Sequence, residues 1–452
     1  MDILGILKMI NNWVWGPPLL VLLVGTGILF TVRLGLIQIV KLPKAFKLIF
    51  KAENNGTGDI NSFGALCTAL AATVGTGNIV GVATAISAGG PGALFWMWVA
   101  AFFGMATKYA EGVLAIKYRT IDANGQVSGG PMYYIEKGLS DKLKGFTKFL
   151  AVFFAVSGIL VALLGIGTFS QVNSIASSLQ STLGVDTRVT SIIVAVLIGI
   201  IVFGGIQAIS KVAEKVVPFM AITYIIFTLI ILVSNGDQII PALGMIFKGA
   251  FTGTAAIGGF TGAIVAKAIQ SGIARGVFSN ESGLGSAPIA AAAAKTEWPA
   301  EQGLISMTGT FIDTIIICTL TGLTLIVTGV WQGEHAGAVM TQDAFAQVLP
   351  TAGPILITIC LTLFAFTTIL GWCYYGERCL EYLMGVKGIT AYRIIFLIMV
   401  ALGGFIQLEV IWTLADIVNG LMALPNLIGL ICLSGVVVKE TKKYMEHLDK
   451  VK

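Results

Sequence analysis

Long apolar runs separated by short polar segments dominate the chain. Eleven of them are long enough to cross the ~30 Å hydrocarbon core of a bilayer as helices. These runs lie at 15–36, 63–88, 93–116, 149–179, 189–206, 216–233, 251–294, 304–330, 353–384, 392–408 and 410–438. The longest polar loop, 120–148, contains Gly129-Gly130-Pro131 and is expected to form one interfacial helix. The pattern predicts an all-α polytopic membrane protein with about eleven transmembrane helices.

The basic residues orient these spans. Of the 28 Lys and Arg residues, 24 fall in alternate loops on one side, and Lys8, Arg188 and Lys248 fall on the other. Positive loops stay in the cytoplasm, so we expect an outside N-terminus and a cytoplasmic C-terminus in the plasma membrane. The first residues carry no basic cluster ahead of the apolar run, so the first span is expected to be retained rather than cleaved.

The composition of the chain is that of a membrane protein and makes several other functions improbable. The 452 residues are 56% hydrophobic and 11% charged, whereas soluble domains carry roughly 25% charged residues. The net charge of +5 is explained by cytoplasmic loops facing anionic lipid, so no nucleic-acid partner is expected. The six cysteines lie in or beside apolar runs and the two histidines in polar stretches. No metal–His site or organic cofactor is expected, and an enzyme would have only Asp313 and Asp416 as a weak acid pair.

The second span is interrupted by the sequence Thr73-Val74-Gly75-Thr76-Gly77-Asn78. Each glycine weakens a helix by about 1 kcal/mol, and an unwound turn is tolerated in a membrane only where it lines a cavity. Freed carbonyls there can bind a hard cation, and freed N–H groups can bind a carboxylate. The alternatives are a small-residue packing face or a dinucleotide fingerprint, although no strand precedes this motif.

The seventh span is interrupted too, which suggests an internal repeat. The interrupted spans are five apart, so the two units enter the membrane from opposite sides. We therefore expect inverted five-helix repeats at 61–235 and 236–438. They would be preceded by an extra helix and basic loop at 1–60 and followed by a cytoplasmic tail at 439–452. Such pairs of broken helices indicate the binding site of a transporter.

Other polar residues lie within apolar spans. Thr367 and Thr368 in span nine could bind Na⁺ through neutral oxygens or bond back to their own helix. Gln171 in span four could reach a ligand or bridge helices. The intramembrane acids Asp313 and Asp416 are functional by default, and Lys267 could neutralise one of them.

Two motifs give the chain a family resemblance. Gly75-Thr76-Gly77-Asn78 and the run Phe278-Ser279-Asn280-Glu281-Ser282-Gly283-Leu284-Gly285-Ser286-Ala287-Pro288 resemble the alanine or glycine:cation symporter family over essentially the whole chain. The chain also resembles the wider leucine-transporter-type superfamily of five-plus-five inverted repeats. The resemblance implies a sodium-coupled secondary symporter that takes up alanine, glycine or similar small neutral amino acids by alternating access, and we expect it to function as a monomer.

The resemblance also implies site residues. Sodium would be held by Ala71, Val74, Phe364, Thr367 and Thr368. The chain departs from the superfamily in its sixth core helix, which lacks the usual unwound Ser/Thr-rich stretch, and we place the break near Gln270-Ser271-Gly272. Substrate would be bound by Thr73, Gly75, Thr76, Gly77, Asn78, Gln171, Gln270, Ser271, Gly272, Thr367 and Trp372. Two further hypotheses are a proton-coupled amino-acid transporter and a channel. The hydroxyl and carbonyl oxygens of the predicted ion site do not titrate, which favours sodium over a proton as the coupling ion.

Overall fold

A computed structural model of the chain describes residues 3–51, 55–143, 145–252, 261–405 and 409–451. In chain order, its first half contains α1 (Ile3–Val14), α2 (Pro17–Arg33), α3 (Ile37–Val40), α4 (Leu42–Lys51), α5 (Ser62–Thr73), the π-helix η1 (Gly77–Gly81), α6 (Val82–Gly89), α7 (Gly92–Tyr118), β1 (Thr120–Ile121), β2 (Val127–Ser128), α8 (Pro131–Leu143), α9 (Gly145–Leu164), α10 (Phe169–Leu183), α11 (Thr187–Val202) and α12 (Gly205–Ser234).

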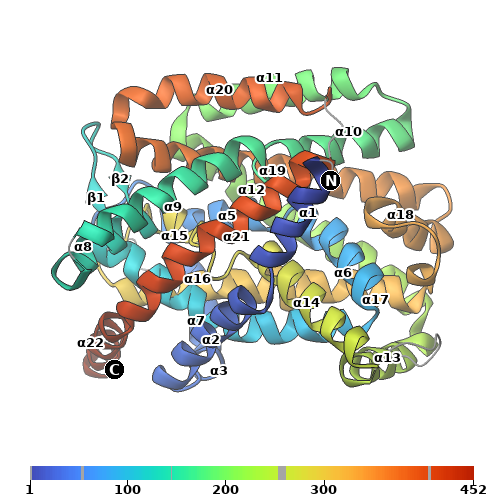
Figure 1. Cartoon of the computed structure of the whole chain (residues 1–452), viewed down its shortest axis with the longest axis horizontal. Coiled ribbons are helices and arrows are strands. Elements are labelled where there is room, and N and C mark those ends of the chain that lie inside the picture. The colour runs from blue at the N-terminus through green and yellow to red at the C-terminus, as the bar shows by residue number, and fades with distance from the viewer. Residues whose placement is uncertain (1–2, 52–54, 144, 253–260, 406–408, 452) are drawn as a thin grey trace.

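The second half continues with η2 (Gly236–Gln238), α13 (Ile239–Phe251), α14 (Thr261–Asn280), α15 (Ala287–Ala291), α16 (Pro299–Thr310), the π-helix η3 (Phe311–Cys318), α17 (Thr319–Val327), η4 (Val330–Gln332), α18 (Gly337–Val348), α19 (Ala352–Met384), η5 (Val386–Gly388), α20 (Ile389–Leu402), α21 (Glu409–Cys432) and α22 (Ser434–Val451). Helices therefore make up almost the whole molecule (Figure 1).

The described helices confirm a multi-pass membrane protein. Seven are long and apolar enough to cross a bilayer, and α5 with η1–α6, bent by 51°, makes an eighth if the pair counts as one span. The predicted fifth span is the shorter apolar helix α11. The seventh and tenth correspond to α14 and α20, although 253–260 and 406–408 lie outside the described residues. The count of eleven stays a prediction.

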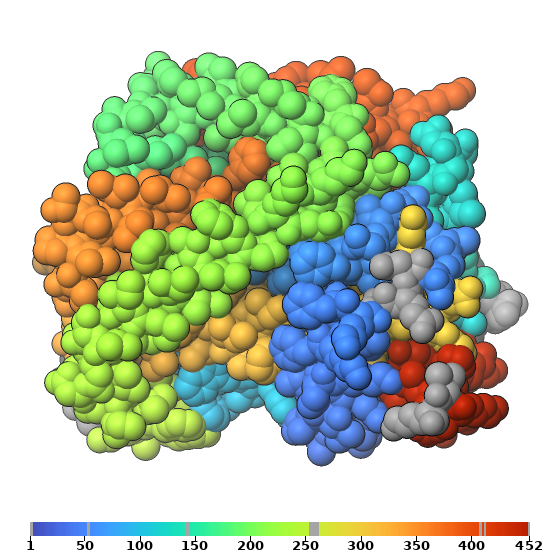
Figure 2. Space-filling view, turned by 180° about the vertical axis from the view of Figure 1, so that it is seen from behind, coloured from blue at the N-terminus to red at the C-terminus, as the bar shows by residue number. Residues whose placement is uncertain are grey.

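The outer surface suits lipid. Along α12, exposed apolar side chains recur every three or four residues on one face, at Phe219, Ile222, Ile226, Leu229 and Val233. This spacing forms a continuous apolar stripe on a helix. In Figure 2, α12 crosses the face of the molecule diagonally in yellow-green. Since water would not favour so large an apolar surface, this stripe faces the hydrocarbon.

The loop predicted to hold one helix contains α8, preceded by the short antiparallel pair β1–β2 in which Thr120 lies opposite Ser128. The hairpin was not predicted. It places Asp122 beside the buried guanidinium of Arg378 in α19, with 3.1 Å between the two charged groups. The loop is thus fastened to the end of α19, the helix that carries Thr367 and Thr368.

The predicted break at Gln270-Ser271-Gly272 is wrong, because α14 runs without interruption from Thr261 to Asn280. Gly272 instead lets α14 pack closely against α7. A Cβ atom at Gly272 would lie 2.3 Å from the Ala93 carbonyl oxygen and 2.7 Å from the Trp96 Cβ in α7. Small residues allow membrane helices to approach this closely, and the packing outweighs the low helix propensity of glycine. The actual break follows α14, at residues 281–286.

Candidate functional site

The break in span two releases backbone groups where the sequence predicts it. In an unbroken helix, Gly75 N–H would donate to the Ala71 carbonyl, and Thr76 N–H to Ala72. Instead, Gly75 donates to Asn78 Oδ1 at 2.9 Å, and Thr76 donates to Gln171 Oε1 at 3.4 Å. The Ala71 and Ala72 carbonyls therefore lose their helical donors.

The same change affects the next predicted ligand. Asn78 N–H donates to the Gly75 carbonyl at 3.3 Å rather than to Val74, its helical partner. Val74 itself leaves the helix, with φ −76° and ψ 89°. The hydroxyl oxygen of Thr76 is buried and has no hydrogen-bond partner among the described residues. Polar backbone and side-chain atoms are thus concentrated between Ala71 and Asn78.

Helix α19 packs directly onto this break. A Cβ at Gly75 would lie 2.3 Å from Thr368 Oγ1, and a Cβ at Gly371 would lie 2.6–3.0 Å from the Ala72 Cβ, Cα and N. The hydroxyl of Thr368 therefore lies against the Gly75 backbone. The structure thus brings together the segments of the two helices that carry the predicted sodium ligands.

The two threonine hydroxyls bond back to their own helix. Thr367 Oγ1 donates to the carbonyls of Leu363 and Phe364 at 3.1 and 3.0 Å, and Thr368 Oγ1 donates to Phe364 at 2.9 Å. This is the geometry expected if the two hydroxyls only bond back to their own helix. A hydroxyl that donates still keeps two lone pairs, so back-bonding leaves both oxygens capable of binding a cation.

The break after α14 is a dense polar segment that the sequence analysis did not assign to the site. Glu281 has a φ of 57°, and Gly283 and Gly285 each have a φ of 86°, so the chain turns through the left-handed region three times. Backbone groups here bond to buried side chains: Lys108 Nζ donates to the Asn280 carbonyl at 2.8 Å. A detectable signal existed, because the stretch 279–286 contains seven Ser, Asn, Glu or Gly residues among eight.

Residues next to the two breaks meet at Asp313. Its carboxylate accepts from Asn78 Nδ2 at 2.7 Å and from Ser279 Oγ at 2.9 Å, and Thr314 Oγ1 adds a third bond at 2.7 Å. A Cβ at Gly77 would lie 3.1 Å from Ser279 Cα. Asp313 sits in the π-helix η3, and such helices occur frequently at functional sites. This buried acid joins span two to span seven.

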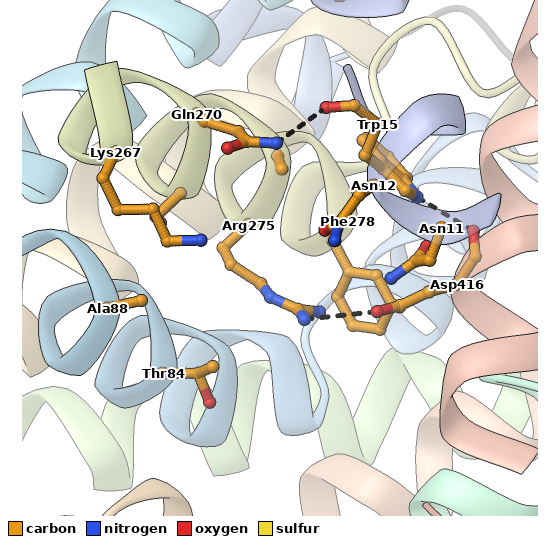
Figure 3. Close-up of a pocket in the computed structure, with 12 residues that line it drawn as sticks. Asn11, Asn12, Trp15, Thr84, Ala88, Lys267, Gln270, Arg275, Phe278 and Asp416 are labelled. Carbon is orange, nitrogen blue, oxygen red and sulfur yellow. Dashed lines mark hydrogen bonds and ion pairs between the residues drawn. The ribbon is translucent and has the colours of Figure 1, made fainter. Parts of the chain in front are cut away.

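Gln270 and Ser271 lie elsewhere, in a separate cavity of about 130 Å³ between α1, α6, α14 and α21. Figure 3 shows Gln270 donating to the Trp15 carbonyl, at 3.3 Å, and Arg275 paired with Asp416, at 3.2 Å. No residue from 73 to 78 lines this cavity. Lys267, which could have neutralised one of the two acids, pairs with neither in the structure. Arg275 pairs with Asp416, and Asp313 is bonded by the three side-chain donors given above. Lys267 lines this cavity and a neighbouring one.

Trp372 is buried beside the second break. Its indole N–H donates to Glu281 Oε1 at 3.0 Å, and the other carboxylate oxygen accepts from Ser286 Oγ. The sequence placed Trp372 at a substrate cavity, whereas its polar atom is already engaged by the protein.

Comparisons with known proteins match this arrangement. A family model described as the sodium:alanine symporter family matches residues 2–452. The chain is 54% identical to the sodium/alanine symporter AgcS of Methanococcus maripaludis, over 99% of this chain and 98% of that protein. It is 56% identical to an uncharacterised transporter of Haemophilus influenzae, over 99% and 97% of the two chains.

A solved structure shares the fold. The crystal structure of MhsT in complex with L-phenylalanine has a TM-score of 0.62 to this chain, at 11% identity, over 85% of this chain and 93% of that one. At this identity the likeness shows the fold alone. Together, these comparisons confirm the family resemblance and the predicted all-α polytopic fold class.

Proposed function

Because the chain belongs to the sodium:alanine symporter family, we propose that it is a secondary transporter. It couples inward sodium movement to the uptake of small neutral amino acids such as alanine and glycine. One observation carries the proposal: Asp313 bonds both Asn78, just after the break of α5–α6, and Ser279, just before the break of α14–α15. Paired broken helices of this kind supply binding groups at the membrane midplane.

Sodium binds at the junction of α5 and α19 in this proposal. Its ligands are the carbonyls of Ala71, Val74 and Phe364 and the hydroxyls of Thr367 and Thr368. The proposal is supported by the loss of the helical donors to Ala71 and Val74 and by the contact between Thr368 and Gly75. Na⁺ is a hard cation and is suited by oxygen ligands. These oxygens do not titrate near neutral pH, which favours sodium over a proton as the coupling ion.

The substrate carboxylate binds the amides of Gly75, Thr76 and Gly77, with Asn78 and Gln171 beside them. The long 3.4 Å bond from Thr76 N–H to Gln171 Oε1 leaves this donor weakly held, so a charged carboxylate can take it over. The nearby Asp313 and Glu281 are acidic and would repel a second carboxylate. The site therefore favours a small neutral zwitterion.

Transport proceeds by alternating access. On one side of the breaks lies the cavity of about 130 Å³ lined by α1 and α14. Between α5, α15 and α16, a space of about 10 Å³ lined by Thr73 and Lys108 would hold roughly one water. We assign the larger cavity to the outside, in keeping with an outside N-terminus in the plasma membrane. Sodium and substrate then stabilise the same arrangement of the two repeats, which is thermodynamic coupling.

Uptake of labelled alanine into proteoliposomes tests this function, with sodium and proton gradients imposed separately. An inward sodium gradient should drive accumulation above equilibrium, and a proton gradient in sodium-free buffer should not. Full uptake on the proton gradient alone would overturn the sodium assignment. Ion flux that is independent of any amino acid would instead indicate a channel.

A further inference from the structure

Glu281 occupies a costly position. It is a non-glycine residue at φ 57°, a backbone conformation that is strained for such residues. Its side chain is also fully buried within a membrane protein, where acids are expensive. Such a residue persists when its contacts hold it, and both of its carboxylate oxygens are bound.

One of those contacts leads to the helix that carries the proposed sodium ligands. Trp372 lies four residues after Thr368 in α19, so the two side chains share one face of the helix, one turn apart. The Trp372 indole N–H donates to Glu281 Oε1 at 3.0 Å in a buried setting. A single helical turn therefore separates the ion junction from the break in span seven.

The indole has little freedom to move. The ring of Tyr375 stacks edge-on against it with 5.4 Å between the ring centroids. On another side, a Cβ at Gly167 would lie 2.8 Å from the Trp372 Cβ, so the backbone between α9 and α10 abuts this side chain. The indole is also almost fully buried, so a shift of α19 is expected to displace its partner Glu281.

Glu281 passes that displacement to the unwound segment. Its second oxygen accepts from Ser286 Oγ, at the far end of residues 281–286, so the carboxylate spans the whole break. The preceding residue, Asn280, is fixed by Lys108 Nζ through its carbonyl at 2.8 Å, and the same ammonium interacts electrostatically with Glu281. The break is thus held between α7 and α19.

We propose that the Trp372–Glu281 hydrogen bond transmits sodium occupancy on α19 to the break in span seven, which adjoins the substrate-binding amides of span two where Ser279 lies against Gly77. This inference rests on the proposed function. Sodium binding holds α19 against α5. Trp372 then holds the Glu281 carboxylate in place through its hydrogen bond. Glu281 in turn orders residues 281–286, next to Ser279 and Gly77. Trp372 accordingly acts as a positioning residue through Glu281.

The test is the ratio of alanine dissociation constants measured without and with saturating sodium, on purified full-length protein. Coupled sites typically show ratios of about 5–150, and we expect the wild type to fall in this range. Trp372→Phe keeps the aromatic ring and removes the donor, so it should bring the ratio below about twofold. Glu281→Gln keeps an acceptor but removes the charge, so it should lower the ratio by a smaller factor.

Trp96→Phe is the matched control, because it removes an indole N–H that donates to a carbonyl of another helix, that of Ala250 in α13 at 3.2 Å. It should leave the ratio unchanged. The double variant Trp372→Phe/Glu281→Gln should couple no more weakly than Trp372→Phe alone, since both changes remove one link.

The outcomes separate the two proposals. If the alanine affinity of the wild type does not depend on sodium, the proposed sodium coupling itself is refuted. If the wild type is coupled and neither Trp372→Phe nor Glu281→Gln changes the ratio of dissociation constants, the role of the Trp372–Glu281 bond is refuted and the proposed function is not. If Trp372→Phe fails to fold, the ratio of Glu281→Gln decides the matter. A lower melting temperature with an unchanged ratio would show that the bond is only structural.

Discussion

Substituting Gly75 by alanine directly tests the junction between α5 and α19. The added Cβ would lie 2.3 Å from Thr368 Oγ1 and 3.5 Å from Gln171 Oε1. Ordinary contact begins at about 3.4 Å, so the methyl group and the hydroxyl must separate by about 1 Å. Thr368 can yield only by rotating away, which breaks its 2.9 Å bond to the Phe364 carbonyl, or by pushing α19 outward.

Either response removes a proposed sodium ligand. Overpacking of this kind costs about 1–3 kcal/mol. Sodium binding requires Thr368 to return to the crowded position, so this cost falls on the sodium-bound state. Since about 1.4 kcal/mol corresponds to a tenfold change in an equilibrium constant, apparent sodium affinity should fall roughly 5- to 150-fold. Sodium titration of labelled-alanine binding measures this value, and thermal melting of the same preparation reports folding.

Gly81→Ala provides the matched control. Gly81 lies in the π-helix η1, close to the same break, and a Cβ there would meet no atom within 4 Å. Its φ of −64° suits any residue, so this variant should bind sodium normally and melt slightly higher, because alanine favours a helix. If Gly75→Ala bound sodium and alanine within twofold of Gly81→Ala, the ion would have to bind elsewhere.

Gly272→Ala should melt at a lower temperature by overpacking against Ala93, with the alanine affinity of the folded fraction unchanged; weaker alanine binding at unchanged melting would restore Gly272 to the substrate site. Thr367→Val should lower apparent sodium affinity while expression stays near normal; unchanged sodium dependence would make this hydroxyl a packing group. A cysteine replacing the exposed Glu334 should react with an impermeant thiol reagent from outside, and one replacing the exposed Asn124 only from inside; the reverse labelling would invert the proposed topology.

The break in span two was predictable because its signal is local. Gly75 and Gly77 flank Thr76 within an apolar run, and a helix interior disfavours both glycines. The released carbonyls of Ala71 and Val74 then follow from the geometry of the helix, since the donors four residues later are the ones displaced. Thr367 and Thr368 could be recognised as candidate ligands by the same reasoning, but the sequence did not show that Gly75 allows Thr368 to approach.

The break in span seven shows where local reasoning fails. Gly272 and Gly283 both lie in polar, glycine-containing stretches, yet one packs in an intact helix and the other turns the chain at φ 86°. The neighbouring helix α7 distinguishes them. Its backbone packs closely against Gly272, whereas its Lys108 donates a hydrogen bond to the Asn280 carbonyl, where α14 ends. A glycine alone does not tell close packing from a turn.

The partner of a buried charged side chain cannot be predicted from the sequence for a related reason. Asp313 was recognised as an acid in an apolar span, and its cost implies a partner. Nothing in the sequence chooses Asn78, which lies 235 positions away, over the nearer Lys267. Several neutral donors can satisfy a buried carboxylate as one cation does, so the need for a partner does not define its type. The polar side chains that join the two breaks are therefore set by how the repeats pack, and the coupling proposed for Trp372 and Glu281 became visible only once α19 and the second break were placed together.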